Sequence, residues 1–454
     1  MAYVSTNPTT GEVIATFDEH TEAEVDAKLT AAATAFSAYR STTFEERATW
    51  MRAAADLLDG ELPNVAEVLT AEMGKTFAAA KGEVSKCSLT MRYYAEHAAE
   101  LLAFEEIASP ASRSGIRYEP LGPVLAVMPW NFPLWQVVRF AAPALMAGNV
   151  GVLKHASNVP QSAILLEDLF RRAGFPNGVF TNLLVSSSKV AGIIADDRIA
   201  AVTLTGSEAA GRSVAAAAGQ ALKKCVLELG GSDPFVVLES ADLDRAVPMA
   251  VTGRVQNNGQ SCIAAKRFIV VDAVYEEFVA RFSAEMEALV VGDPMDPATN
   301  VGPLVSAAQR EEIAGQVDDA IAKGAVVHAG GRAVEGPGFF YRPTVLSGVD
   351  PSMRAGCEEL FGPVAVVERV ADLAEALRVA NSTPWGLGAS VWVTDPDERE
   401  AAISGLESGM VFVNAIVAST PELPFGGIKL SGYGRELSAA GIREFCNAKT
   451  VYIA

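Results

Sequence analysis

Hydrophobic positions in the first hundred residues recur at helical spacing, and two helix starts carry a capping signal. The segments Thr21–Glu24 and Thr43–Glu46 each begin with a hydroxyl and end, three residues later, with a carboxylate. This arrangement satisfies free backbone N–H groups at a helix start. We predict that the second helix stops at Gly60 and that a third helical segment covers residues 77–102. The pattern predicts helices throughout this region.

From residue 123 onward, short apolar runs alternate with helical segments. The runs are predicted as strands at Val124–Met128, Val150–Lys154, Phe180–Val185, Ala200–Leu204, Phe235–Leu238, Phe268–Val271, Val364–Glu368 and Ala389–Val393. The intervening helices are predicted at Leu134–Ala147, Pro160–Ala173, Glu208–Gly219, Val274–Leu289, Leu373–Ala380 and Glu398–Leu406. Buried strands joined by crossover helices predict an α/β fold with parallel sheets covered on both faces. The glycine pair at 230–231 predicts a boundary between two such lobes, with a ligand cleft between them.

Composition excludes several classes of protein. Half of the 454 residues are hydrophobic and 20% are charged, which excludes intrinsic disorder. A net charge of −19 without a basic run argues against nucleic-acid binding. Five scattered cysteines and four scattered histidines give neither a disulfide framework nor metal-ligand spacing. Prolines interrupt the longest uncharged stretch, and no secretion signal is present, so we expect a cytoplasmic protein without a membrane span or a metal.

Three residues are candidates for chemistry on local context alone. Cys262 follows a polar segment, Asn257–Ser261, and is either a small buried hydrophobe or a nucleophile. Glu228 lies inside an apolar run, where its carboxylate either faces water or has a raised pKa suited to a general base. Asn131 stands in a proline-bracketed turn and is either structural or an oxyanion donor.

Two further positions suggest a phosphate-bearing ligand. Lys154 ends a predicted strand, and ligands of open α/β sheets bind at the carboxyl ends of strands. Gly206 and Ser207 open a predicted helix whose free N–H groups favour a pyrophosphate. No G-x-G-x-x-G sequence is present, so each signal by itself is weak.

Seven blocks in order along the chain together resemble the aldehyde dehydrogenase superfamily. They read MPWNFPLWQ, VLKHASN, TLTGSEAAG, LELGGSDPF, NNGQSC, EELFGPV and PFGGIKLSGYGRE. The blocks are most similar to those of bacterial NADP-dependent succinate-semialdehyde dehydrogenases. The resemblance implies an aldehyde dehydrogenase fold, with two Rossmann-like parallel-sheet lobes and a small β oligomerisation element. It also implies oxidation of succinate semialdehyde to succinate.

The resemblance assigns a chemical role to each of the three candidates. Cys262 matches the nucleophile, whose thiolate adds to the aldehyde to give a thiohemiacetal. Asn131 and the backbone N–H of Cys262 would hold the oxyanion. Hydride transfer to nicotinamide then leaves a thioester, and Glu228 matches the base that activates water to hydrolyse it. No histidine lies in a matching block, which argues against the rival class of a cysteine hydrolase. The presence of all three groups argues against a catalytically dead scaffold.

The resemblance also names the cofactor and its contacts. The matching positions are Trp130, Lys154, Ser157, Gly206, Ser207, Glu359 and Phe361. Relatives that prefer NAD often carry a glutamate at the position of Ser157, which repels a 2′-phosphate. Serine removes that charge and Lys154 adds a positive one, so NADP is expected to be preferred, while NAD binding is also permitted.

The substrate carboxylate is expected to meet Arg139, a lone cation in an apolar segment that needs an anionic partner. Ser419 and Trp135 are expected at the rim and wall of the same tunnel. Some relatives bring a second arginine where this chain has Gln256, and others have arginine where it has Leu430. Glutarate semialdehyde remains an alternative substrate, because one methylene changes discrimination by only about 1–3 kcal/mol.

The resemblance implies the following domains. Residues 1–111 and 125–230 would bind the cofactor, residues 231–430 would form the catalytic domain, and residues 112–124 with 431–454 would form the oligomerisation element. Within the family this element adds strands to a partner's sheet, which implies a homodimer or homotetramer.

Overall fold

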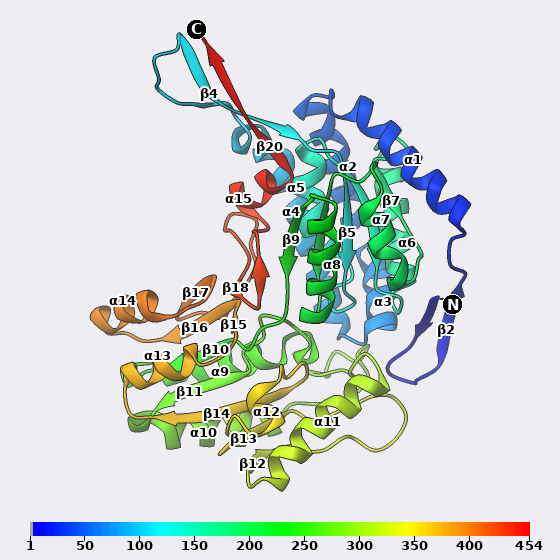
Figure 1. The fold of residues 1–454 in the computed structure, drawn as a ribbon. Helices are drawn as coiled ribbons and strands as arrows, with labels where there is room; N and C mark the ends of the chain where they lie inside the picture. Colours follow the sequence, from blue (N-terminus) through cyan, green and yellow to red (C-terminus); the bar gives the residue numbers. More distant parts are fainter. Residues whose placement is uncertain (1–2) are drawn as a thin grey trace.

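The computed structural model describes residues 3–454 and contains two α/β lobes and a projecting β ribbon (Figure 1). Each lobe is built on its own, mostly parallel sheet, and the chain passes from the first sheet to the second between Glu228 and Pro234. The predicted α/β class with two parallel-sheet lobes is confirmed.

The first lobe has a six-stranded sheet in the order β19-β9-β8-β5-β6-β7, in which β19 alone is antiparallel to its neighbour. Its strands are β5 (Pro123–Met128), β6 (Val150–His155), β7 (Phe180–Asn182), β8 (Ala201–Thr205), β9 (Lys224–Glu228) and β19 (Gly432–Tyr433). Its helices are α1 (Glu22–Tyr39), α2 (Phe44–Gly60), α3 (Leu62–Met73), α4 (Phe77–Leu101), α5 (Trp135–Met146), α6 (Pro160–Arg172), α7 (Val190–Ala195) and α8 (Glu208–Gln220). Helices cover the sheet, so the central strands are almost wholly buried.

The second lobe has a seven-stranded sheet in the order β12-β13-β14-β11-β10-β16-β17, parallel except for β12. Its strands are β10 (Pro234–Val237), β11 (Arg267–Val271), β12 (Val326–Ala329), β13 (Thr344–Ser347), β14 (Val364–Val370), β16 (Gly388–Trp392) and β17 (Met410–Val413). Its helices are α9 (Leu243–Val255), α10 (Asp272–Glu287), α11 (Ala307–Ala322), α12 (Arg354–Cys357), α13 (Leu373–Asn381) and α14 (Pro396–Gly405). A short pair, β15 (Trp385–Gly386) with β18 (Ile428–Lys429), lies between the two lobes.

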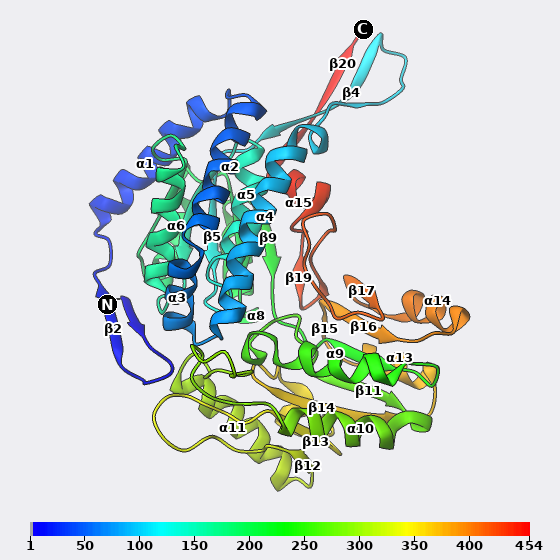
Figure 2. The same cartoon turned by 180° about the vertical axis from the view of Figure 1, so that it is seen from behind.

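The ribbon consists of β4 (Arg113–Pro120) paired antiparallel with β20 (Cys446–Ile453), with β3 (Glu105–Glu106) beside β4. It extends away from both lobes (Figures 1 and 2). The short helix α15 (Ser438–Glu444) leads into β20. Most side chains of β20 are exposed, so the ribbon presents a long strand pair that is packed mainly against itself.

The helical prediction for the first hundred residues is correct in most of the region and wrong at its start. Both capping boxes form, at Thr21 and Thr43, and α2 ends at Gly60 as predicted. The chain begins instead with a hairpin of β1 (Tyr3–Thr6) and β2 (Val13–Phe17). These strands are too short to give a clear alternating pattern. The strand predicted over 180–185 stops at Asn182.

Within residues 3–454, no helix is both long and apolar enough to cross a membrane.

Candidate active site

Four parallel strands of the first lobe end at one edge of their sheet. Because β9, β8, β5 and β6 are neighbours, the residues that follow them are brought together. Glu228 ends β9, Gly206 follows β8, Trp130 follows β5, and Lys154 is the last residue but one of β6. The sequence-predicted nucleotide residues of these strands therefore share one edge of the sheet.

The loop before Cys262 runs through a left-handed backbone. Asn257 and Asn258 have φ of 55° and 57°, and Gly259 has φ of 75°. Asparagine tolerates this region better than most residues, and glycine adopts it freely. A Cβ at Gly259 would lie 2.4 Å from the backbone of Gly362, so glycine is also required there by space.

Buried amide side chains hold this loop in place. Asn257 Nδ2 donates to the Asn131 carbonyl (2.8 Å), and Asn258 Nδ2 donates to the Gly74 carbonyl (2.8 Å). Gln260 Oε1 accepts from the Val305 N–H (2.9 Å). The polar run predicted before Cys262 is thus buried, and the side chains of Asn257, Asn258 and Gln260 each hold it by at least one hydrogen bond.

Two cations that were not predicted from the sequence also hold the loop before Cys262 in place. Lys266 Nζ donates to the carbonyls of Ser261 (3.0 Å) and Cys262 (2.5 Å), and it lies 3.2 Å from Glu359 Oε1. Arg254 Nη2 donates to the Gly259 carbonyl (2.7 Å). A lysine four residues after the cysteine was visible in the sequence, but nothing in the pattern indicated that its ammonium group turns back onto the loop.

Cys262 lies where two cavities meet. One cavity, of about 220 Å³, is lined by Trp130, Gly206, Glu359 and other residues of the sheet edge. The other, of about 310 Å³, is lined by residues of α4, α5 and the segment that ends at Phe425. Cys262 lines both, so its thiol is accessible to ligands held in two separate compartments. We call them the sheet-edge cavity and the helix-side cavity.

Asn131 is buried beside the thiol and also lines the sheet-edge cavity. Its Nδ2 donates to the Gln260 carbonyl (3.1 Å), and its own carbonyl accepts from Lys75 Nζ (3.0 Å). The side chain is therefore fixed to the loop that carries Cys262. The structure brings these two predicted residues together.

Glu228 is placed differently from the other two. Its carboxylate is buried, forms no hydrogen bond, and lines neither cavity. Burial and the neighbouring Glu436 raise the pKa of Glu228 well above its ordinary value, although Arg139 and Arg435 oppose the shift. Burial therefore disfavours the charged form of this carboxyl group.

The thiol of Cys262 is also kept in its neutral form. Burial raises its pKa to about 11, although Arg139 and Lys266 lower it in part. A thiolate is the reactive form, so this site needs a proton acceptor before the sulfur can attack.

The remaining sheet-edge residues line the same cavity and bring an aromatic pair, a carboxylate and a helix cap to it. The rings of Trp130 and Phe361 meet edge to face with centroids 5.7 Å apart. Glu359 Oε1 accepts from the Gly231 N–H (3.1 Å), and a Cβ on Gly230 would lie 2.4 Å from Glu359 Oε2. The Ser207 hydroxyl caps α8. The cavity therefore has an apolar wall, a carboxylate and a helix N-terminus.

Lys154 and Ser157 lie at the end of β6, outside the lining of the sheet-edge cavity. Lys154 is largely buried, and burial lowers its pKa. Within residues 3–454, no carboxylate comes within ion-pair distance of its ammonium group. Ser157 is exposed. A buried cation without an anion is an open site for one.

From the sequence we expected the substrate carboxylate to be the anionic partner of Arg139. In the structure that partner is Glu436 of the same chain. Arg139 is buried, forms an ion pair with Glu436, donates to Thr205 Oγ1 (3.2 Å) and stacks over Phe425. The partner comes from the chain itself, because the C-terminal segment folds back over α5. Arg139 still lines the helix-side cavity, together with Trp135, Ser419 and Gln256.

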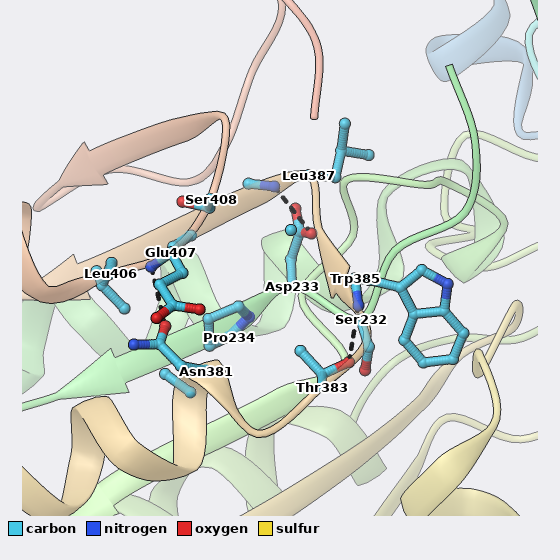
Figure 3. Close-up of a pocket in the computed structure, with 14 residues that line it drawn as sticks. Ser232, Asp233, Pro234, Asn381, Thr383, Trp385, Leu387, Leu406, Glu407 and Ser408 are labelled. Carbon is cyan, nitrogen blue, oxygen red and sulfur yellow. Dashed lines mark hydrogen bonds between the residues drawn. The ribbon is translucent and has the colours of Figure 1, made fainter. Parts of the chain in front are cut away.

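Figure 3 shows another cavity, between β10 and β16, which does not include Cys262. Its volume is about 10 Å³, which is the minimum for a single water molecule. Asp233 lines it, accepts from the Gly388 N–H (3.1 Å), and has a pKa raised by burial to about 7. The cavity is too small for an organic substrate and does not include Cys262, so it is not part of the candidate site.

A family model described as the aldehyde dehydrogenase family matches residues 2–451. The chain belongs to the aldehyde dehydrogenase family. The family resemblance inferred from the seven sequence blocks is confirmed.

Two named relatives align with the whole length of this chain. It is 58% identical to a protein of Mycobacterium avium named succinate-semialdehyde dehydrogenase [NADP(+)], over 100% of this chain and 97% of that protein. It is also 58% identical to a protein of Mycobacterium tuberculosis (strain H37Rv) named succinate-semialdehyde dehydrogenase [NADP(+)] 1, over 100% of both chains. The crystal structure of succinic semialdehyde dehydrogenase from Streptococcus pyogenes in complex with NADP+ is 40% identical, has a TM-score of 0.97 and is covered fully in both directions.

One departure from the family pattern, at Leu430, remains without a mechanistic role. Leu430 donates its N–H to the Pro384 carbonyl (2.9 Å), and nothing in the structure explains the leucine side chain. Cys225 lies near Tyr433 and has a pKa raised by burial to about 11. Within residues 3–454, no group of histidine, cysteine, aspartate and glutamate side chains has the arrangement of a metal site.

Proposed function

We propose that this aldehyde dehydrogenase oxidises succinate semialdehyde to succinate with NADP+ as the preferred oxidant and NAD+ as a weaker one. The observation that carries the proposal is the position of Cys262 at the junction of two cavities, because the reaction needs an aldehyde and a nucleotide on opposite sides of one sulfur. The names of relatives at 58% identity over the whole chain support the choice of substrate and cofactor.

The first step forms a carbon–sulfur bond. Cys262 loses its proton to a base and its sulfur attacks the aldehyde carbon held in the helix-side cavity. The carbonyl π electrons move to oxygen, and the Asn131 Nδ2 and the Cys262 backbone N–H stabilise that oxyanion. In the structure Asn131 Nδ2 instead donates to Gln260. We infer that the substrate oxyanion takes over this donor.

The second step converts the thiohemiacetal to a thioester, and water then cleaves the thioester. When bound, NADP+ supplies the acceptor for the hydride that leaves the former aldehyde carbon. Glu228, once it has ionised outside its buried position, takes a proton from the water whose oxygen bonds to the thioester carbon, and the carbon–sulfur bond then breaks to give succinate and free Cys262. We infer that Glu228 rotates out of its buried position for this step, because neither of its oxygens is held by a hydrogen bond.

The sheet edge fits a nucleotide that carries an extra phosphate. The start of α8 offers backbone N–H groups to a pyrophosphate, and Trp130 with Phe361 offers an apolar surface to a ring. Lys154 is a cation without a partner, and Ser157 adds a hydroxyl beside it without adding negative charge. Glu359 would hold the ribose next to the nicotinamide. These side chains suit a 2′-phosphate better than a site with a glutamate at 157 would.

The domain assignment and the assembly are part of the same proposal. Residues 1–111 and 125–230 bind the nucleotide, residues 231–430 carry the nucleophile, and residues 112–124 with 431–454 join protomers. Three features support the last assignment: the ribbon of β4 and β20 extends from the lobes, β20 is largely exposed, and β17 is an edge strand with a cavity of about 320 Å³ beside it. Pairing of the ribbon with a second copy would give a dimer or a tetramer, which light scattering on the full chain measures.

The test of the proposed function is a set of initial rates on the purified full-length enzyme. We expect kcat/KM with NADP+ to be higher for succinate semialdehyde than for glutarate semialdehyde, and higher with NADP+ than with NAD+. A higher kcat/KM for glutarate semialdehyde would show that glutarate semialdehyde, rather than succinate semialdehyde, is the substrate. If the enzyme hydrolysed a simple ester but oxidised no aldehyde with NADP+, it would be a hydrolase and the proposed reaction would be wrong.

A further inference from the structure

The helix-side cavity holds two cations, and one of them is already neutralised by the chain. Arg139 pairs with Glu436, donates to Thr205 and stacks over Phe425. Breaking a buried pair of this kind is costly, because it strands a charge away from water. The guanidinium of Arg139 therefore has an anion before any substrate enters.

The second cation is Lys86, on α4, which the sequence analysis did not consider. Its ammonium group lines the same cavity, lies 4.1 Å from the ring centroid of Trp135 and donates to the Ser419 hydroxyl (2.7 Å). Throughout residues 3–454, no carboxylate comes within ion-pair distance of it. The carboxylate one turn earlier on α4, Glu83, is paired with Lys75 instead.

Glu83 is unavailable to Lys86 for a further reason. Its second oxygen accepts the backbone N–H groups of Leu134 and Trp135, both at 2.9 Å, at the start of α5. This carboxylate thus fixes the beginning of α5 and carries the charge of a buried lysine. Because Glu83 is already occupied, Lys86 is the cation in the helix-side cavity that has no anionic partner.

Ser419 completes a receptor with two donors. Its hydroxyl accepts from Lys86 Nζ, so the hydroxyl hydrogen remains free to donate. An ammonium group has three donors, and one is used on Ser419. A carboxylate placed between them would receive a charge-assisted hydrogen bond and a hydroxyl hydrogen bond, while the ring of Trp135 shields the pair from water.

We propose that Lys86, with Ser419, binds the carboxylate of the substrate and so determines specificity for aldehydes with a terminal acid group. The inference rests on the proposed function, since it concerns the far end of the same substrate. Arg139 adds positive potential from the wall of the cavity while it remains paired with Glu436. Lys86 is one of the specificity-determining residues, and it takes no part in bond breaking.

The protonation of Lys86 adds an independent signature. Burial, with a smaller contribution from Arg139 on α5, lowers the pKa of Lys86 to about 8, while Cys87 and Glu83 on its own helix and the nearby Cys262 oppose the shift. Above pH 8 the free enzyme loses the ammonium charge and with it the attraction for a carboxylate. An uncharged aldehyde does not sense this loss, and titration of Cys262 affects both substrates equally.

The test is a ratio: kcat/KM for succinate semialdehyde divided by kcat/KM for butanal, which has the same chain length and no carboxylate. Lys86→Met keeps the apolar stem and removes the charge, so we expect the ratio to fall about 10- to 100-fold, mainly through KM. Lys86→Arg should retain most of the ratio, because it keeps the charge. In the wild-type enzyme the ratio should fall as the pH rises through about 8.

The matched control is Lys81→Met, an exposed lysine on the same helix that lines neither cavity. Its ratio should equal that of the wild type. An unchanged ratio in Lys86→Met would overturn the inference about Lys86 and leave the proposed function intact. If Lys86→Met does not fold, a wild-type ratio that stays flat across pH 8 overturns it instead. A wild-type enzyme that oxidises butanal but not succinate semialdehyde refutes the proposed function itself.

Discussion

The two cavities that meet at Cys262 are built in different ways. The sheet-edge cavity is made largely from the ends of parallel strands and the start of α8, with the side chains of Trp130, Phe361 and Glu359 in its lining. The helix-side cavity is made from the sides of α4 and α5 and the segment before Phe425, and it contains buried charges. Its chemistry depends on which of those charges already has a partner.

This difference decides what each cavity reveals before its ligand is known. At the sheet edge, a residue that directly follows a strand can be predicted from the sequence to lie in the site, because neighbouring parallel strands end at the same edge. In the helix-side cavity, position is insufficient. Arg139 and Lys86 both line it, but Glu436 neutralises only the arginine. The partners of a buried charge assign its role better than its location does.

The largest effect is expected at Cys262, which lines both cavities. Cys262→Ala removes the sulfur that becomes bonded to the substrate, so we expect NADPH formation from any aldehyde to fall by at least about 10⁴-fold. NADP+ binding, measured by fluorescence quenching, should persist. The matched control is Cys225→Ala, a cysteine of the first lobe that lines neither cavity, which should keep its activity. Retained turnover in Cys262→Ala would show that Cys262 is not the nucleophile and that the two cavities do not serve one reacting sulfur.

A smaller effect is expected behind the helix-side cavity, at Glu228. Glu228→Gln matches the neutral acid in shape but cannot accept a proton, so thioester hydrolysis should slow about 10²- to 10⁴-fold. Stopped-flow absorbance should show a rapid burst of NADPH close to one equivalent per site, followed by slow turnover. Because the burial that raises the pKa of Glu228 opposes ionisation, the thermal midpoint of the variant should equal or exceed that of the wild type. Loss of the burst would assign Glu228 to thiol activation instead.

The smallest effect is expected at the sheet edge. Ser157→Glu adds a negative charge beside Lys154 and should lower the ratio of kcat/KM for NADP+ to that for NAD+ about 10- to 100-fold. The aldehyde specificity should stay the same, because Ser157 does not line the helix-side cavity. Ser37→Glu adds the same charge to an exposed position of α1 and serves as the control. A ratio that does not move in Ser157→Glu contradicts the assigned basis of NADP+ preference.

Much of the fold was predictable because its signals are local. The capping boxes at Thr21 and Thr43 and the alternation of apolar runs with helices gave the first helices and most parallel strands. The hairpin Tyr3–Phe17 was missed, because its pairing joins strands of four and five residues with little periodicity. The residues around Cys262 came from seven matching blocks and could not be derived from composition.

The parts of the site that could not be predicted are long-range contacts between side chains. Glu436 reaches Arg139 across nearly three hundred residues of chain, and Ser419 reaches Lys86 across 333. Nothing in the neighbourhood of Arg139 indicated that its anion would come from the C-terminal segment. The buried position of Glu228 was equally hidden, since an apolar run containing one carboxylate fits both an exposed and a buried side chain.

The shared sulfur also has a consequence for covalent inhibitors. A small acidic electrophile entering beside α4 and an electrophile mounted on a nucleotide-like scaffold would arrive from opposite directions at one point of attachment. Only one of them can be bonded at a time. Each class of compound therefore shields the enzyme from the other, even though the two cavities have only Gln136 and Cys262 in common among the residues that line them.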